Sequence, residues 1–186
     1  MTGRSEVLGR IRLVAVYVFI AALVYMSRPT PFLLAAGTAF ALAGESIRIW
    51  AAGHLTKSVR LVTAGPYAYT QNPLYLGRLL ILTGLAIATR TEGYLNLVAL
   101  ALGYVVFFFY YIPRKVRVEG GRLARLHGAS FEAYQRSVPI LIPGLRRYAG
   151  GRERWSFGLM VRNQEPLVFT GIVLVLVLLA WKTTHP

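Results

Sequence analysis

Hydrophobic residues gather in five segments of the chain, separated by short polar or basic stretches. The segments are Leu13–Met26, Phe32–Gly53, Pro73–Ala88, Tyr94–Ile112 and Pro166–Trp181. A helix needs about 20 apolar residues to cross the hydrocarbon core of a bilayer, and arginines that snorkel can lengthen a segment that is slightly short. The pattern predicts an all-α fold, a polytopic membrane helical bundle of about five transmembrane helices that forms a single integral membrane domain over residues 1–186.

The first segment is also compatible with a signal peptide, because Arg4, Arg10 and Arg12 precede its apolar core. The sequence VYMSRPTP that follows has no small-residue cleavage site. We therefore expect a retained transmembrane helix.

Composition supports the membrane interpretation. The chain is 55% hydrophobic with a mean hydropathy of +0.51, and 21 Lys and Arg face 7 acidic residues, for a net charge of +14. Nucleic-acid binding also fits such a charge, but the basic residues lie between apolar segments, where they meet anionic lipid headgroups. We expect no nucleic-acid partner. Disulfides, thiolate nucleophiles and cysteine metal sites are excluded because the chain has no cysteine.

The basic residues predict an orientation. The N-terminus, the 54–72 connection and the 114–163 stretch together hold 16 Lys and Arg. Five spans place all three regions on one side of the membrane, which is the cytoplasmic side by the positive-inside rule. We therefore expect a cytoplasmic N-terminus and a C-terminus on the opposite side.

The 114–163 stretch is patterned as a cytoplasmic, interfacial helical segment. Apolar residues recur at three-to-four spacing at Leu123, Leu126, His127, Phe131 and Tyr134, and charged residues take the other face. Gly120–Gly121 and Gly128 weaken the helix, and VPILIPG is predicted to end it.

The stretch GPYAYTQNPLYLG, residues 65–77, combines turn and helix-start signals. Gly65–Pro66 predicts a turn, Asn72 is a suitable helix cap, and Pro73 suits the first helical position. Gly77 and Gly84 lie seven residues apart, where small residues let helices approach closely. The tyrosines also fit an ordinary aromatic belt at the membrane interface.

Several charged residues lie where a simple membrane anchor would not need them. Arg78 is inside the third segment, and Glu45 and Arg48 are three apart in the second, so they can form a pair. Glu165 precedes Pro166 and suits a helix cap. Lone histidines give no metal-ligand spacing, so we expect no metal site.

Two motifs in order resemble the isoprenylcysteine carboxyl methyltransferase and phospholipid methyltransferase superfamily of integral membrane enzymes. The first is GPYAYTQNPLYLG, against the family pattern G-x-Y-x-x-x-R-H-P-x-Y-x-G. The second, after a hydrophobic hairpin, is VEGGRLARLHGASFEAYQRSVPILIPG, against a pattern that opens with two glutamates and ends in Val-Pro. The resemblance covers residues 60–145, with a weaker echo in WSFGLMVRNQEP.

The resemblance implies a set of site residues. Its cofactor-binding positions are Tyr67, Asn72, Pro73, Tyr75, Gly77, Leu123, Tyr134 and Pro139, and its catalytic candidates are Glu119, Arg117, Glu165 and Arg162. Asn72 stands where the family has histidine and Gly120 where it has a second glutamate. Asparagine still offers a donor and an acceptor, but it cannot carry a proton near neutral pH.

The implied activity is methyl transfer from S-adenosylmethionine to a lipophilic acceptor at the cytoplasmic interface. Tyrosine faces and a carboxylate such as Glu119 can hold a cationic sulfonium. Arg114, Arg117 and Arg162 can position an anionic acceptor, and contact with lipid headgroups explains these arginines equally well. We expect Asn72, Tyr75 and Glu119 to line one cavity. Lipid, isoprenoid, fatty acid and small hydrophobic amine or thiol all remain open as acceptors, and the oligomeric state is undetermined.

Two other functions stay open on the sequence. Membrane reductases of the sterol or steroid type share a similar C-terminal helical arrangement and bind NADPH, for which the arginines of 114–154 offer phosphate contacts. Alternatively, the replacements at Asn72 and Gly120 fit a non-catalytic, lipid-binding membrane protein.

Overall fold

The computed structural model describes residue 14 and residues 18–56 and 60–185. The regular secondary structure of this part of the chain is helical, loops connect the helices, and one isolated bridge joins Ser27 and Thr91. Its α-helices are α2 (Pro31–Ala52), α3 (Pro73–Thr89), α4 (Leu95–Val106), α5 (Ile112–Lys115), α6 (Gly121–His127), α7 (Ala129–Ser137), α8 (Phe157–Arg162) and α9 (Glu165–Thr184). Most of the first predicted segment, with Arg4, Arg10 and Arg12, lies outside the described residues, although 18–25 is helical.

Apolar side chains on the outside of the bundle identify a membrane protein. Phe109, Leu102 and Val177 are 81%, 62% and 59% exposed. Three described helices, Pro31–Ala52, Glu92–His127 and Glu165–Thr184, are long and apolar enough to cross a bilayer, and α3 is slightly shorter at 17 residues. An all-helical membrane fold is therefore confirmed, while the count of five spans is not.

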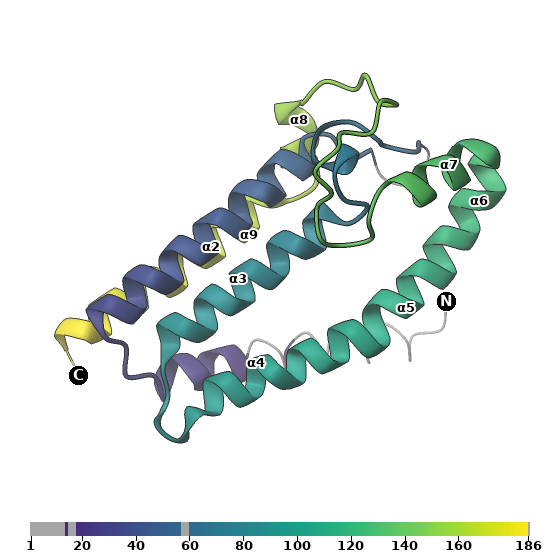
Figure 1. Cartoon of the computed structure of the whole chain (residues 1–186). Coiled ribbons are helices and arrows are strands. Elements are labelled where there is room, and N and C mark those ends of the chain that lie inside the picture. The colour runs from purple at the N-terminus through teal and green to yellow at the C-terminus, as the bar shows by residue number, and fades with distance from the viewer. Residues whose placement is uncertain (1–13, 15–17, 57–59, 186) are drawn as a thin grey trace.

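Helices α2, α3 and α9 run side by side, and α4 to α6 form one long helix that lies along α3 at its start and extends away from α2 and α9 (Figure 1). The closest contact is between α2 and α3. A Cβ on Gly44 would lie 2.5 Å from the Gly77 carbonyl oxygen, and one on Gly84 would lie 2.4 Å from the Gly37 carbonyl oxygen. The predicted small-residue contact through Gly77 and Gly84 is confirmed, and α2 is the partner.

This contact predicts the effect of one added methyl group. We expect Gly84→Ala to lower the free energy of unfolding by about 1–3 kcal/mol, because backbone of α2 occupies the space of the new Cβ. Gly103→Ala is the matched control, since no described residue outside the adjoining backbone of its own helix comes within 4 Å of its Cβ position. Thermal unfolding in detergent measures both, and equal midpoints for the two variants would contradict the close-contact explanation.

The fourth segment is longer than predicted. Helix continues beyond Ile112 to His127, through Pro113 and through Gly120–Gly121. Wider π-helical turns at Phe107–Tyr111 and Val116–Gly120 adjoin these residues. Such turns accommodate a proline's missing N–H and ring within a continuous helix. The helix instead breaks at Gly128, whose φ is +49°, a conformation that glycine adopts at little cost.

The segment after Gly128 packs on the stretch before α3. A buried cluster forms from two residues of α7, Phe131 and Tyr134, and from Val138 directly after it. Leu123 packs against this cluster. Leu126, predicted on the same apolar face, is 56% exposed. The helix ends at Ser137, directly before VPILIPG, as predicted.

Candidate functional site

The site begins at the turn before α3. Gly65 has φ +59°, and a short 3₁₀ turn, Gly65–Ala68, brings the chain to Asn72, where α3 begins with Pro73. Asn72 occupies the cap position, but its side chain does not cap the helix. Its amide nitrogen donates to the Ile140 carbonyl at 2.8 Å instead. The sequence therefore predicted the helix start correctly and the role of the Asn72 side chain wrongly.

The strap of residues 138–148 holds this turn in place through backbone hydrogen bonds. The amide of Gln71 donates to the Pro139 carbonyl at 2.9 Å, and the amide of Gly144 donates to the Tyr69 carbonyl at 2.8 Å. The Gln71 side chain donates to the Val138 carbonyl at 2.6 Å. The two family motifs, far apart in sequence, thus form one structural unit.

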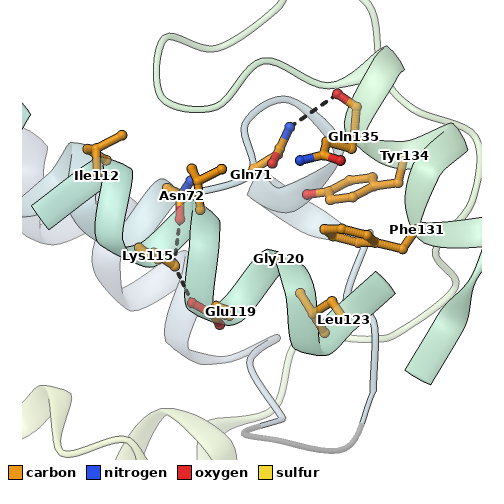
Figure 2. Close-up of a pocket in the computed structure, with 11 residues that line it drawn as sticks. Gln71, Asn72, Ile112, Lys115, Glu119, Gly120, Leu123, Phe131, Tyr134 and Gln135 are labelled. Atoms are coloured by element: carbon orange, nitrogen blue, oxygen red, sulfur yellow. Dashed lines mark hydrogen bonds and ion pairs between the residues drawn. The ribbon is translucent and has the colours of Figure 1, made fainter. Parts of the chain in front are cut away.

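A pocket lies where this unit meets the long helix, and Figure 2 shows most of its side chains. Its lining residues are Gln71, Asn72, Ile112, Lys115, Val116, Glu119, Gly120, Leu123, Phe131, Tyr134 and Gln135. The long-helix members recur every three or four residues, so they form one stripe along that helix. Its continuation beyond Ile112 is what brings the stripe to the pocket.

A cation already lies among the polar groups of the pocket. The Lys115 ammonium donates to the Asn72 carboxamide oxygen and pairs with the Glu119 carboxylate at 3.2 Å. The same ammonium lies 4.5 Å from the centroid of the Tyr75 ring. Figure 2 shows the first two contacts as dashed lines. An amide oxygen, a carboxylate and an aromatic face therefore converge on one positive charge, with the Glu119 side chain 54% exposed.

Two tyrosines form the rigid base of the site. The Tyr134 hydroxyl donates to the Tyr67 carbonyl at 2.8 Å. Burial is the main reason that the pKa of both phenols lies well above the usual range. The neighbouring Tyr134 phenol raises the pKa of Tyr67 further, and the Tyr148 phenol does the same for Tyr134. Both hydroxyls therefore stay protonated, and they serve as neutral structural groups.

Four of the predicted site residues line this pocket together: Asn72, Glu119, Leu123 and Tyr134. Tyr75 does not line it; its ring packs edge-on against Phe107 at 5.7 Å, and the face of the ring lies 4.5 Å from the Lys115 ammonium of the pocket. Tyr67, Pro73 and Gly77 are buried beneath the site, and Pro139 contacts Gln71 from the strap.

Three predicted catalytic residues lie elsewhere. Arg117 lines a second hollow on another side of the long helix, with Tyr110 and Arg114. Arg162 is exposed in the last turn of α8. Glu165 is 2% exposed at the start of α9.

Glu165 belongs to a buried ion cluster instead of capping α9. Its carboxylate accepts two close hydrogen bonds from Arg48 Nη2, at 2.8 and 3.0 Å, and one from Nε at 3.1 Å. Arg48 also lies 3.6 Å from Glu45, confirming the predicted pair. Among the described residues, neither Glu45 oxygen has a hydrogen-bond donor, and the Arg48 guanidinium is paired with both carboxylates. The cluster links α2 to α9.

Arg78, the other intramembrane arginine, lies over the Tyr75 ring at 5.5 Å.

Sequence reasoning missed Lys115 and Gln71. Lys115 precedes Glu119 by four residues, the spacing at which a helix brings opposite charges together. The sequence shows this spacing, but an ion pair just beyond an apolar segment is also typical of an ordinary surface contact. Among the described residues, no group of three His, Asp or Glu side chains is placed to hold a metal ion.

Fold and site together define a helical membrane protein with a cation-holding pocket where its helices leave the apolar region. The model of one family, phospholipid methyltransferase, matches residues 32–129, which include α2 from its second residue, α3 and the whole long helix. The chain belongs to this family of integral membrane methyltransferases.

The chain is also similar to two curated bacterial proteins. It is 32% identical to the cobalt-zinc-cadmium resistance protein CzcN of Cupriavidus metallidurans, over 65% of this chain and 54% of the relative. It is 32% identical to the nickel-cobalt-cadmium resistance protein NccN of Alcaligenes xylosoxydans xylosoxydans, over 53% of this chain and 44% of the relative. The chain thus spans about half the length of these relatives. No solved structure matches it.

Proposed function

We propose that this protein transfers a methyl group from S-adenosylmethionine to a lipophilic acceptor at the cytoplasmic face of a membrane. Family membership supports methyl transfer. The observation that carries the proposal is the convergence of Asn72, Glu119 and Tyr75 on a single cation. Carboxylates and aromatic faces are the groups that hold a sulfonium without reacting with it.

The residues present fit a cationic methyl donor. Glu119 is half-exposed and can turn its carboxylate to a ligand, while Tyr134 and Phe131 form a buried wall that excludes water. When bound, S-adenosylmethionine supplies an electrophilic methyl group on a positively charged sulfur. Asn72, Glu119 and Tyr75 would hold that charge, and the fixed walls would align it with the acceptor.

The acceptor determines whether the site needs a base. A carboxylate or a thiolate is already ionised and requires only alignment with the donor. An amine must lose a proton, and Glu119 is the ionisable acid that lines the pocket and is within reach. Asn72 stands where the family has histidine, and its side chain offers hydrogen bonds but does not take up a proton near neutral pH. The names of the two relatives concern metal resistance, and we assign no metal substrate to this chain.

We propose a five-span topology with a cytoplasmic N-terminus and the pocket at the cytoplasmic end. The C-terminal end of α2 and the N-terminal ends of α3 and α9 lie at the same end of the bundle as the pocket (Figure 1). The basic 114–163 stretch lies there too, and we propose that it forms the catalytic segment at the interface. Arg28, Arg90 and Lys182 lie at the other end. This asymmetry supports the orientation.

Ligand-dependent thermal shift in detergent tests the proposed cofactor. We expect S-adenosylmethionine and S-adenosylhomocysteine to raise the unfolding temperature, because a ligand that binds only the folded state stabilises it. NADPH is the comparison. Stabilisation by NADPH alone would favour a reductase, and no shift with any of the three would favour a non-catalytic protein.

Lys115 makes a sharper prediction, because its ammonium occupies the place proposed for the sulfonium. We expect Lys115→Met to raise the affinity for S-adenosylmethionine about fivefold relative to S-adenosylhomocysteine, since a cationic ligand no longer has to displace an ion pair and a cation–π contact. Calorimetric titration with both ligands measures the ratio. Equal weakening of both would contradict this and would place Lys115 on the ligand's carboxylate.

A further inference from the structure

A second hollow lies on another side of the long helix from the proposed active site. Its lining residues are Phe109, Tyr110, Pro113, Arg114, Arg117 and Val118. They repeat at helical spacing and form a stripe that shares no residue with the pocket around Lys115 and Glu119. The hollow is therefore separate from the proposed reaction site.

We propose that this hollow binds an anionic phospholipid of the surrounding bilayer, with the phosphate on Arg114 and Arg117 and an acyl chain along Phe109. The lipid is a bound structural partner and not the methyl acceptor, because Lys115 and Glu119 lie on the other stripe. The proposal rests on the position of the hollow along the helix, on its exposed aromatic side chains and on its charge.

The length of the helix places the hollow at the membrane boundary. The apolar part of the long helix begins at Leu95. About 20 helical residues cross the hydrocarbon core, so the helix leaves it close to Arg114. Phe109 then lies at acyl-chain depth and Arg117 at headgroup depth. Tyrosine is the residue expected between these two zones, and Tyr110 is there.

The apolar half of the hollow faces outward and has no partner helix. Phe109 is 81% exposed and Tyr110 is 51% exposed. Aromatic surface at this depth gains stability by contact with acyl chains, which a free phosphate ion cannot provide. This exposure selects a lipid over a soluble anion as the occupant.

The polar half carries two positive charges and no acid among its lining residues. Arg114 donates to the Tyr110 hydroxyl at 2.7 Å and lies over its ring at 5.8 Å, which holds the guanidinium at the rim. The Arg117 guanidinium has no hydrogen bond or ion pair with any residue that the structure describes. The nearby Glu119 carboxylate is engaged by Lys115. Two guanidinium groups side by side suit the oxygens of one phosphate.

Native mass spectrometry of the full chain, released from detergent after titration with lipid, tests the proposal. We expect retained phosphatidylglycerol to exceed retained phosphatidylcholine. Arg114→Gln and Arg117→Gln should each weaken phosphatidylglycerol binding about fivefold, from the attraction of one basic residue to an anionic membrane surface. Phe109→Ala should weaken it as well. Arg125→Gln is the matched control, because Arg125 is exposed on the same helix outside the hollow.

Specific outcomes would overturn the proposal. Equal binding of phosphatidylglycerol and phosphatidylcholine would show that charge does not select the lipid. If Arg125→Gln weakened phosphatidylglycerol binding as much as Arg114→Gln and Arg117→Gln do, the effect would come from general surface charge and not from the hollow. Displacement of the lipid by millimolar inorganic phosphate would show a soluble-anion site, and a dimer lost in Arg117→Gln would show that a second copy covers the hollow. Unfolding temperatures of all variants exclude misfolding, and no outcome depends on whether the protein binds S-adenosylmethionine.

Discussion

Replacing Glu119 by glutamine is expected to weaken S-adenosylmethionine binding at least tenfold, while S-adenosylhomocysteine binding changes less. The substitution keeps the size of the side chain and removes the negative charge that pairs with a cation in this pocket. A tenfold loss corresponds to about 1.4 kcal/mol, close to the lower limit for a hydrogen bond to a charged group. Calorimetric titration of the purified protein with both ligands measures the effect. Truncation, as in Glu119→Ala, should abolish binding of the cationic ligand.

The control for this prediction is Glu132→Gln. Glu132 is an exposed glutamate of α7 that pairs with Arg136 at 3.5 Å and does not line the pocket. It should leave both affinities unchanged. If Glu119→Gln also bound S-adenosylmethionine as tightly as the parent protein, with an unchanged unfolding temperature, Glu119 would not hold the donor and our assignment of the site would be wrong.

The second large effect is expected at the buried ion cluster between α2 and α9. Arg48→Met should lower the free energy of unfolding by about 3–5 kcal/mol, the cost of leaving buried charges without a partner. Within the described part of the chain, Arg48 is the residue that forms ion pairs with both Glu45 and Glu165, and all three side chains are nearly inaccessible. Unfolding by heat or denaturant in detergent measures the loss.

Two further variants separate lost charge compensation from lost packing. Arg136→Met removes an arginine whose pair with Glu132 is 83% and 61% exposed, and we expect almost no change, as for most surface pairs. Neutralising both carboxylates in the Arg48→Met background, with Glu45→Gln and Glu165→Gln, should recover most of the lost stability. Failure of that recovery would show that Arg48 acts mainly by filling space.

The cluster also explains why a membrane helix begins with Glu165. A glutamate at a helix start is usually a cap or a favourable partner of the helix dipole. Here it connects α9 to the end of α2, near the base of the site. Gly77 packs directly on the aliphatic part of Arg48, so the cluster, the glycine contact and the start of α3 support one another.

The sequence by itself determined the parts of this protein that depend on local pattern. Runs of apolar residues predicted membrane helices, Asn72–Pro73 predicted the start of α3, and VPILIPG predicted the end of α7. Gly77 and Gly84 predicted a close helix contact. These features follow from helical periodicity, proline and glycine geometry and the length needed to cross a bilayer, all of which act over a few residues.

Only the tertiary structure decided which polar groups meet. Asn72 bonds to Ile140 and Lys115 instead of capping its own helix, and Glu165 pairs with Arg48 across 117 residues of sequence. The long helix passes Pro113 and Gly120–Gly121 because π-helical turns absorb them, which carries Lys115 and Glu119 to the pocket. Buried or partly buried polar groups take the partners that packing places within reach, and packing between distant segments has no local signature in the chain.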